Sequence, residues 1–164
     1  MAGKALVTYF SATGTTAKLA KELADETGAD LVELVPTDPY TEEDLTFLEE
    51  DGKTLKEDSR NYIEAHDDAC RPGIVEIPDV SGYDVVYLGF PIWWYTMPKI
   101  VCTFLEGAAL DGKKLAIFVT SGSTGVDDAE KDAKNLAPRA EVIGAKRFEA
   151  EASAAELKEW ADSL

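Results

Sequence analysis

The residues best suited to chemistry in this sequence are the small hydroxylated ones of the segment 11–16, which reads Ser-Ala-Thr-Gly-Thr-Thr. An apolar, strand-like run from Lys4 to Phe10 precedes this segment, and a helical pattern over residues 17–27 follows it. A strand that leads into a helix in this way leaves backbone N–H groups unpaired at the positive end of the helix dipole, where an anion is favoured. We therefore predict a phosphate monoester site, held without metal or guanidinium, at Ser11, Ala12, Thr13, Gly14, Thr15 and Thr16.

The same six residues also fit an ordinary capped turn between a strand and a helix. Serine and threonine favour helix N-caps whatever else they do. The segment matches neither a P-loop, which ends in Gly-Lys-Ser/Thr, nor a G-x-G-x-x-G turn. On this segment alone the two interpretations carry equal weight.

A second segment, directly after another apolar strand, favours the interpretation of residues 11–16 as part of a ligand site. It contains three consecutive aromatic residues, Trp93, Trp94 and Tyr95, preceded by Pro91 and Ile92. Tryptophan in a loop usually marks binding, and it stacks well on a planar aromatic ligand. Packing of the tryptophans in the core is the alternative explanation.

A third segment of small residues follows the next apolar strand and contains Ser121, Gly122, Ser123 and Gly125. Glycine lets backbone N–H groups approach a ligand closely, here the polar edge of a flat ring. A phosphate pocket, an aromatic wall and a Gly/Ser loop together suit a mononucleotide with a large flat ring.

The elements that must position these segments alternate between strand and helix. The patterns predict strands over residues 4–10, 31–35, 83–90, 113–120 and 141–148, and helices over 17–27, 41–48, 56–69, 97–106, 126–136 and 154–164. Thr96 is expected to cap the helix 97–106, and the more polar strand 141–148 suits a sheet edge. Such alternation predicts one α/β domain, residues 1–164, with a parallel sheet covered by helices on both faces. Ligands of such sheets bind beyond the carboxyl ends of the strands, which is where all three segments lie.

Composition excludes several classes of partner. Thirty-two acidic residues against sixteen basic ones give a formal net charge of −16, which is unfavourable for nucleic acid and anionic membranes. No apolar run approaches a membrane span and residues 1–4 have no signal-peptide core, so we expect a cytoplasmic protein. Cys70, Cys102 and the single histidine, His66, lack metal-site spacing; Cys102 is predicted to be buried and His66 to lie at the surface.

The three segments resemble those of the flavodoxins, specifically the small bacterial flavodoxins with a Pro-Ile-Trp-Trp loop. The matching stretches are residues 9–16, 89–98 and 120–125, and the order of elements agrees along nearly the whole chain. The resemblance implies a three-layer flavodoxin-like sandwich with strand order 2-1-3-4-5 and non-covalently bound FMN. It implies a monomer that carries single electrons at low potential between redox partners. The net charge of −16 would suit partners with basic docking surfaces, although it could equally serve solubility alone.

The resemblance also assigns roles within the site. Residues 11–16 would hold the phosphate, Trp93 would stack on the ring, and the Trp94–Tyr95 peptide would turn to accept the proton of reduced flavin N5. Ser121 to Gly125 would flank the pyrimidine side of the ring. Many flavodoxins cover the outer ring face with a tyrosine in this third loop, and this chain has none there. The outer face would then be open, or covered by Tyr40 or Tyr95.

Two other functions remain possible at this stage. An NAD(P)H-dependent FMN enzyme acting on quinones would use an open ring face, although the net charge and the absence of clustered arginines near the three segments disfavour binding of NADPH. A flavin-free receiver domain would need an acidic pair after the first strand, where this chain has Ser11-Ala12.

Overall fold

A five-stranded parallel sheet forms the centre of the structure, a computed structural model that describes residues 4–164. The strand order is β2-β1-β3-β4-β5, as expected from the resemblance. The strands are β1 (Ala5–Tyr9), β2 (Asp30–Glu33), β3 (Val85–Pro91), β4 (Lys114–Thr120) and β5 (Glu141–Phe148). The most apolar strands, β3 and β4, lie in the interior of the sheet, and the polar β5 forms an edge as its sequence predicted.

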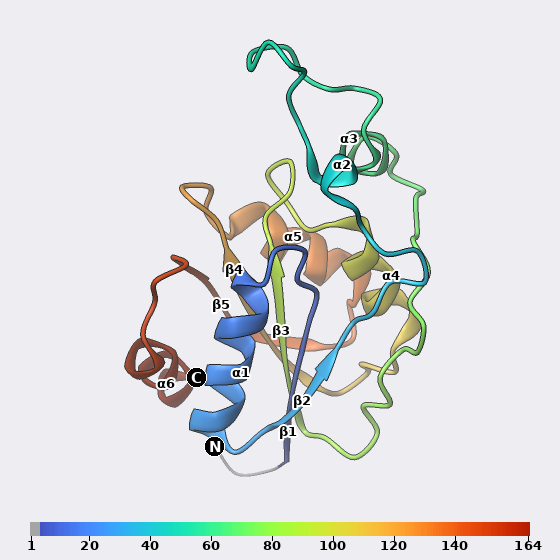
Figure 1. Ribbon diagram of the computed structural model, residues 1–164. Coiled ribbons are helices and arrows are strands. Elements are labelled where there is room, and N and C mark those ends of the chain that lie inside the picture. Colours follow the sequence, from blue (N-terminus) through green and yellow to red (C-terminus); the bar gives the residue numbers. More distant parts are fainter. Residues whose placement is uncertain (1–3) are drawn as a thin grey trace.

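Helices cover both faces of this sheet (Figure 1). Helices α1 (Thr15–Thr27) and α6 (Ala154–Ser163) pack on one face, and α4 (Lys99–Gly107) and α5 (Asp127–Leu136) pack on the other. Two short helices, α2 (Glu42–Leu45) and α3 (Arg60–Ala65), belong to the long connection between β2 and β3. They lie beyond the carboxyl edge of the sheet, above the loop that follows β3 (Figure 1).

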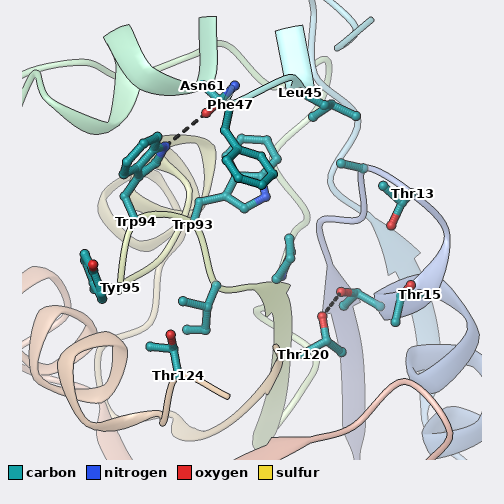
Figure 2. A pocket seen from close by; sticks show the side chains of 14 residues that line it. Thr13, Thr15, Leu45, Phe47, Asn61, Trp93, Trp94, Tyr95, Thr120 and Thr124 are labelled. Carbon is teal, nitrogen blue, oxygen red and sulfur yellow. Dashed lines mark hydrogen bonds between the residues drawn. The ribbon is translucent and has the colours of Figure 1, made fainter. Parts of the chain in front are cut away.

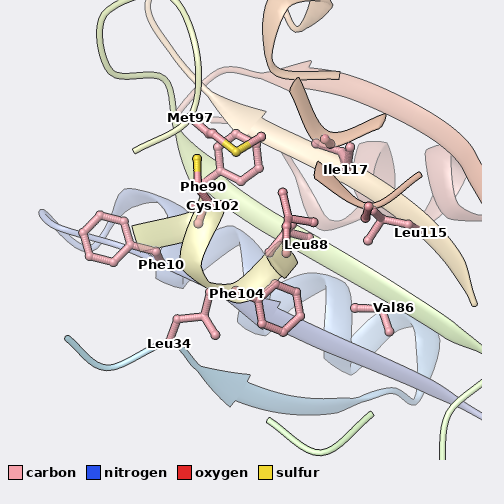
Figure 3. Packing of buried hydrophobic residues seen from close by; sticks show 14 of the residues in the cluster. Phe10, Leu34, Val86, Leu88, Phe90, Met97, Cys102, Phe104, Leu115 and Ile117 are labelled. Atoms are coloured by element: carbon pink, nitrogen blue, oxygen red, sulfur yellow. The ribbon is translucent and has the colours of Figure 1, made fainter. Parts of the chain in front are cut away.

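The two faces of the sheet bury separate hydrophobic cores because successive residues of a strand point to opposite sides. Leu6, Val86 and Leu88 belong to the core under α4 and α5, shown in Figure 3. Their neighbours Val7 and Tyr87 belong to the core under α1 and α6. Burial on both faces explains why these strands are continuously apolar and do not alternate.

Three predicted helical features differ from the structure. The helix expected over 56–69 is only α3, Arg60–Ala65, and the one expected over 41–48 ends at Leu45, although its capping box, Thr41 with Asp44, is present. Thr96 does not cap α4, whose N-cap is Pro98; the Thr96 hydroxyl donates to Asp132 on α5 instead. At the end of α2 and at Thr96, contacts with residues distant in sequence outweigh local helical preference. On either side of α3 the backbone instead forms tight turns, with hydrogen bonds from Ser59 to Lys56 and from Cys70 to Asp67.

Within residues 4–164, no helix combines the length and the apolar character needed to cross a membrane. Cys102 is buried and His66 is exposed, as predicted.

Gly89 in β3 is a position where the fold requires glycine. A Cβ built there would lie 2.1 Å from Cζ of the buried Phe118 on β4. Gly89→Ala is therefore expected to destabilise the protein by about 1–3 kcal/mol, the usual effect of overpacking a core, as measured by urea unfolding. Gly82→Ala is the matched control, because a Cβ there meets no atom within 4 Å, and its stability should stay close to that of the wild type. Equal stability of the two variants would contradict the predicted clash.

Candidate functional site

A cavity of about 440 Å³ opens at the carboxyl edge of the sheet, within the size range of ligand pockets. Most of the residues predicted for the first two segments line it: Ala12, Thr13, Thr15, Thr16, Pro91, Ile92, Trp93, Trp94 and Tyr95. Thr13 and Thr15 lie toward one end, and Trp93 and Trp94 lie toward the other (Figure 2). One end therefore offers hydrogen bonds and the other offers flat apolar surfaces.

The threonine end lies at the start of α1, as predicted. The N-cap of this helix is Gly14, which has a left-handed backbone (φ 94°) and no side chain to bond the first-turn amides. The first turn contains no acidic residue. An anion bound at this helix start would thus meet free N–H donors and the positive end of the helix dipole.

Two hydroxyls of this segment bond to the protein itself. The Thr16 hydroxyl is buried and lies 2.8 Å from that of Thr120 at the end of β4. The hydroxyl of Ser11 accepts a hydrogen bond of 3.1 Å from the Gly14 amide. Both hydroxyls therefore shape the segment, while the side chains of Thr13 and Thr15 line the cavity at the start of α1.

The aromatic end is built on a two-residue turn with an unusual backbone. Trp93 and Thr96 exchange backbone hydrogen bonds of 2.9 and 3.3 Å, and the residues between them, Trp94 and Tyr95, have φ values of 52° and 73°. Positive φ at both central residues is typical of a type I′ turn, which normally contains Asn-Gly. Two bulky residues in this region store strain of about 1–3 kcal/mol each.

Trp93 is held from behind by an aromatic cluster. Its ring packs edge-on against Phe10 and Tyr40, with centroid distances of 5.5 and 5.3 Å. The Tyr40 hydroxyl donates to Glu64 at 2.6 Å, and the Arg60 guanidinium lies 3.7 Å from the centre of the Tyr40 ring. Burial, with the Glu64 carboxylate second, raises the pKa of Tyr40, so this phenol stays neutral. Tyr40 therefore supports Trp93, whereas Tyr95, the other residue considered for the outer ring face, lines the cavity and is 69% exposed.

The third segment borders a second cavity, of about 500 Å³, that shares Thr13, Thr15 and Thr120 with the first. Ser121 and Gly122 line this second cavity. Within the described residues 4–164, the predicted site residues Ser11, Gly14, Ser123 and Gly125 are absent from the walls of both cavities.

An arginine distant in sequence contacts the third segment. Arg147 on β5 donates from Nε to the Ser121 hydroxyl at 3.0 Å and from its Nη2 to the Gly122 carbonyl at 2.6 Å. The sequence showed no clustered arginines near the loops, and the parallel pairing of β4 with β5 brings this single one there.

Thr124, within the predicted range Ser121 to Gly125, also lines the first cavity. Four further lining residues were missed by sequence reasoning: Leu45, Phe47, Asn61 and Thr120. Thr120 directly precedes the predicted third segment. The other three come from the connection between β2 and β3, which contains no motif that marks a ligand site. The one available signal was Phe47, an aromatic residue near the end of the helix predicted over 41–48.

The doubly wound fold defines an α/β protein of the class that has its ligand sites where strand order reverses, and the cavity lies at the carboxyl edge of this sheet. The sequence model described as flavodoxin matches residues 4–164. The chain therefore belongs to the flavodoxin family.

Solved structures agree with this membership. A protein from Bacteroides eggerthii, provisionally named a flavoprotein, is 34% identical over 99% of this chain and 98% of its own, with a TM-score of 0.89. Its counterpart from Bacteroides uniformis is 35% identical over 99% of both chains, with a TM-score of 0.88. A flavoprotein from Lactobacillus acidophilus, crystallised with FMN, is 21% identical over 98% of this chain and 99% of its own, with a TM-score of 0.67, and shows a shared fold. No curated protein matches the chain.

The support behind Trp93 can be tested by stability. Glu64→Leu leaves the Tyr40 hydroxyl and the Arg60 Nε without their shared acceptor, and should lower the free energy of unfolding by about 1–3 kcal/mol in urea titrations. Tyr40→Phe removes one hydroxyl and keeps the ring against Trp93, so its cost should be smaller, about 1 kcal/mol. An unfolding free energy of Glu64→Leu equal to that of the wild type would show that this network does not support the site.

Proposed function

We propose that this protein binds FMN without a covalent bond and carries electrons one at a time between redox partner proteins. The observation that carries the proposal is the cavity with an uncapped helix start at one end and tryptophans at the other. These ends match the two unlike parts of FMN, a dianionic phosphate and a flat isoalloxazine ring. The Lactobacillus acidophilus relative of the same fold was crystallised with FMN.

The residues present fit FMN at both ends. The first-turn amides of α1, with the Thr13 and Thr15 side chains, would hold the phosphate. Trp93 would stack on the ring, Trp94 and Tyr95 would border it, and the third segment would flank its pyrimidine side. The flavin supplies the redox chemistry when bound, and the protein orients it and tunes its potential.

Nearby carboxylates would favour a low potential. Asp132 bonds Thr96 of the aromatic turn, and Glu149 and Glu151 line the adjoining cavity. Negative charge near the ring disfavours an anionic reduced flavin, so the last electron is given up more readily. No side chain of the site has to act as acid, base or nucleophile.

The partners we propose carry basic docking surfaces, which complement the net charge of −16 and speed encounter. The protein would work as a monomer. Two free thiols, Cys70 and Cys102, suit a reducing compartment such as the cytoplasm.

The deciding experiment is an absorbance spectrum of the purified protein followed through anaerobic stepwise reduction. A flavin spectrum with two resolved one-electron steps, and negligible oxidation of NADH or NADPH, is the expected result. Direct reduction by NAD(P)H, with turnover of a quinone, would instead identify the protein as an NAD(P)H-dependent enzyme and overturn the proposed electron carrier. A protein that is colourless and does not take up added FMN would overturn the proposal.

Trp93→Ala is expected to weaken FMN binding about tenfold or more, because the stacking surface on the ring is lost. It should also restore flavin fluorescence, which a stacked indole quenches. Titration of FMN into the apoprotein, followed by fluorescence, measures both effects. Trp93→Phe, which keeps a ring at this position, should bind FMN with an affinity between those of wild type and Trp93→Ala. Unchanged quenching in Trp93→Ala would exclude Trp93 as the stacking residue.

Thr13→Glu is expected to abolish retention of FMN, because it places a carboxylate beside the phosphate. Thr13→Gln has nearly the same size without the charge and serves as the matched control; it should keep most of the affinity. The flavin content of the two variants after gel filtration gives the comparison. Equal retention of FMN in the two variants would show that the phosphate does not bind at the start of α1.

A further inference from the structure

The connection between β2 and β3 contributes a wall to the cavity. Leu45 ends α2, and Phe47 follows it two residues later; both side chains line the cavity that contains Trp93 and Trp94. The Phe47 ring is 56% exposed, although an apolar ring of this size is usually buried. Figure 2 shows Phe47 at the same end of the cavity as the two tryptophans. An exposed aromatic ring facing the flat walls of a pocket is typical of a residue that a ligand covers.

Asn61, in α3, holds the backbone on the N-terminal side of Phe47. This side chain is only 5% exposed, and its Nδ2 donates to the carbonyl oxygens of Asp44 at 2.6 Å and Thr46 at 2.9 Å. The two bonds end α2 and set the direction in which the chain leaves toward Phe47.

The same amide bonds the aromatic turn. Trp94 donates from its indole Nε1 to Asn61 Oδ1 at 3.0 Å (Figure 2). An indole N–H can only donate and a backbone carbonyl can only accept, so a single orientation of the amide satisfies both sides. Asn61 therefore links two segments that are far apart in sequence, the strained turn at Trp94 and the backbone before Phe47.

Contacts around Trp94 strengthen the link. Its ring lies edge-on to Tyr62 and His66, with centroid distances of 5.3 and 5.2 Å, and those two rings stack on each other at 3.9 Å. The connection is thereby packed against the turn as well as hydrogen-bonded to it.

We propose that Phe47 covers the flavin ring face that Trp93 does not contact, and that Asn61, through Trp94, is the positioning residue that keeps Phe47 there. This inference rests on the proposed binding of FMN. It assigns a role to the connection between β2 and β3, and it supplies the cover that the third segment, which lacks an aromatic residue, does not provide. Trp93 and Phe47 would then hold the ring from two separate parts of the chain.

The dissociation rate of FMN tests whether Phe47 covers the flavin ring. Phe47→Ala should raise the dissociation rate about tenfold, measured by stopped-flow from the rise in flavin fluorescence on release, since most changes in affinity within one site arise from dissociation. Ile63→Ala is the matched control. Ile63 has the same 56% exposure in the same connection, and it is absent from the cavity walls within residues 4–164. Its dissociation rate should equal that of the wild type.

A double-mutant cycle tests the positioning role. Trp94→Phe keeps an aromatic ring and removes the donor to Asn61, so it should raise the dissociation rate severalfold in the wild-type background. If Trp94 and Asn61 act by holding Phe47, the same change should have little further effect in Phe47→Ala, and the two effects will fall short of additivity.

Each outcome is decisive. A dissociation rate of Phe47→Ala equal to that of Ile63→Ala, with tight FMN binding by the wild type, would overturn the cover and leave the proposed function standing. Full additivity in the cycle would overturn the positioning role of Asn61. Failure of the wild-type protein to bind FMN would refute the proposed function and the cover that rests on it.

Discussion

Parallel pairing of β1, β3 and β4 brings the segments of the candidate site together. The register sets Tyr9 beside Gly89, Gly89 beside Phe118, and Pro91 beside Thr120. Because all three strands end at one edge, the three ligand-directed segments that follow them start from the same edge of the sheet. The close approach of Gly89 to Phe118 shows how tightly this register is packed directly beneath the site.

The two ends of the site offer different interactions to a ligand. At the start of α1, the lack of a side-chain cap leaves the first-turn amides to a ligand, which lets an acidic protein attract an anion through backbone dipoles. Among the residues of 4–164 that line the first cavity, none is lysine or arginine. In the electron carrier proposed above, surface charge would serve encounter with partners while the cofactor site would rely on neutral donors.

The strained backbone of the aromatic turn is maintained by contacts with neighbouring parts of the fold. Trp94 and Tyr95 have backbone conformations that bulky residues rarely adopt, and such strain survives only where neighbouring contacts outweigh it. Asn61 bonds the Trp94 indole, and Asp132 accepts from Thr96 at the other end of the turn. The turn is thus held on one side by the connection between β2 and β3 and on the other by helix α5. The free-energy cost of its strained backbone is offset by these contacts and by packing elsewhere in the fold.

The α/β class, the strand order implied by the resemblance, and the gathering of the first two segments at one edge of the sheet could all be predicted from the sequence. These features depend on local patterns: continuous apolar runs, a helix start rich in hydroxyls, and adjacent tryptophans. Four features emerge only in the folded chain: Thr16 bonds Thr120, Tyr40 supports Trp93, Arg147 reaches Ser121, and Phe47 and Asn61 line the cavity. Each of these depends on residues at least 26 positions apart in the chain, so no local pattern encodes it.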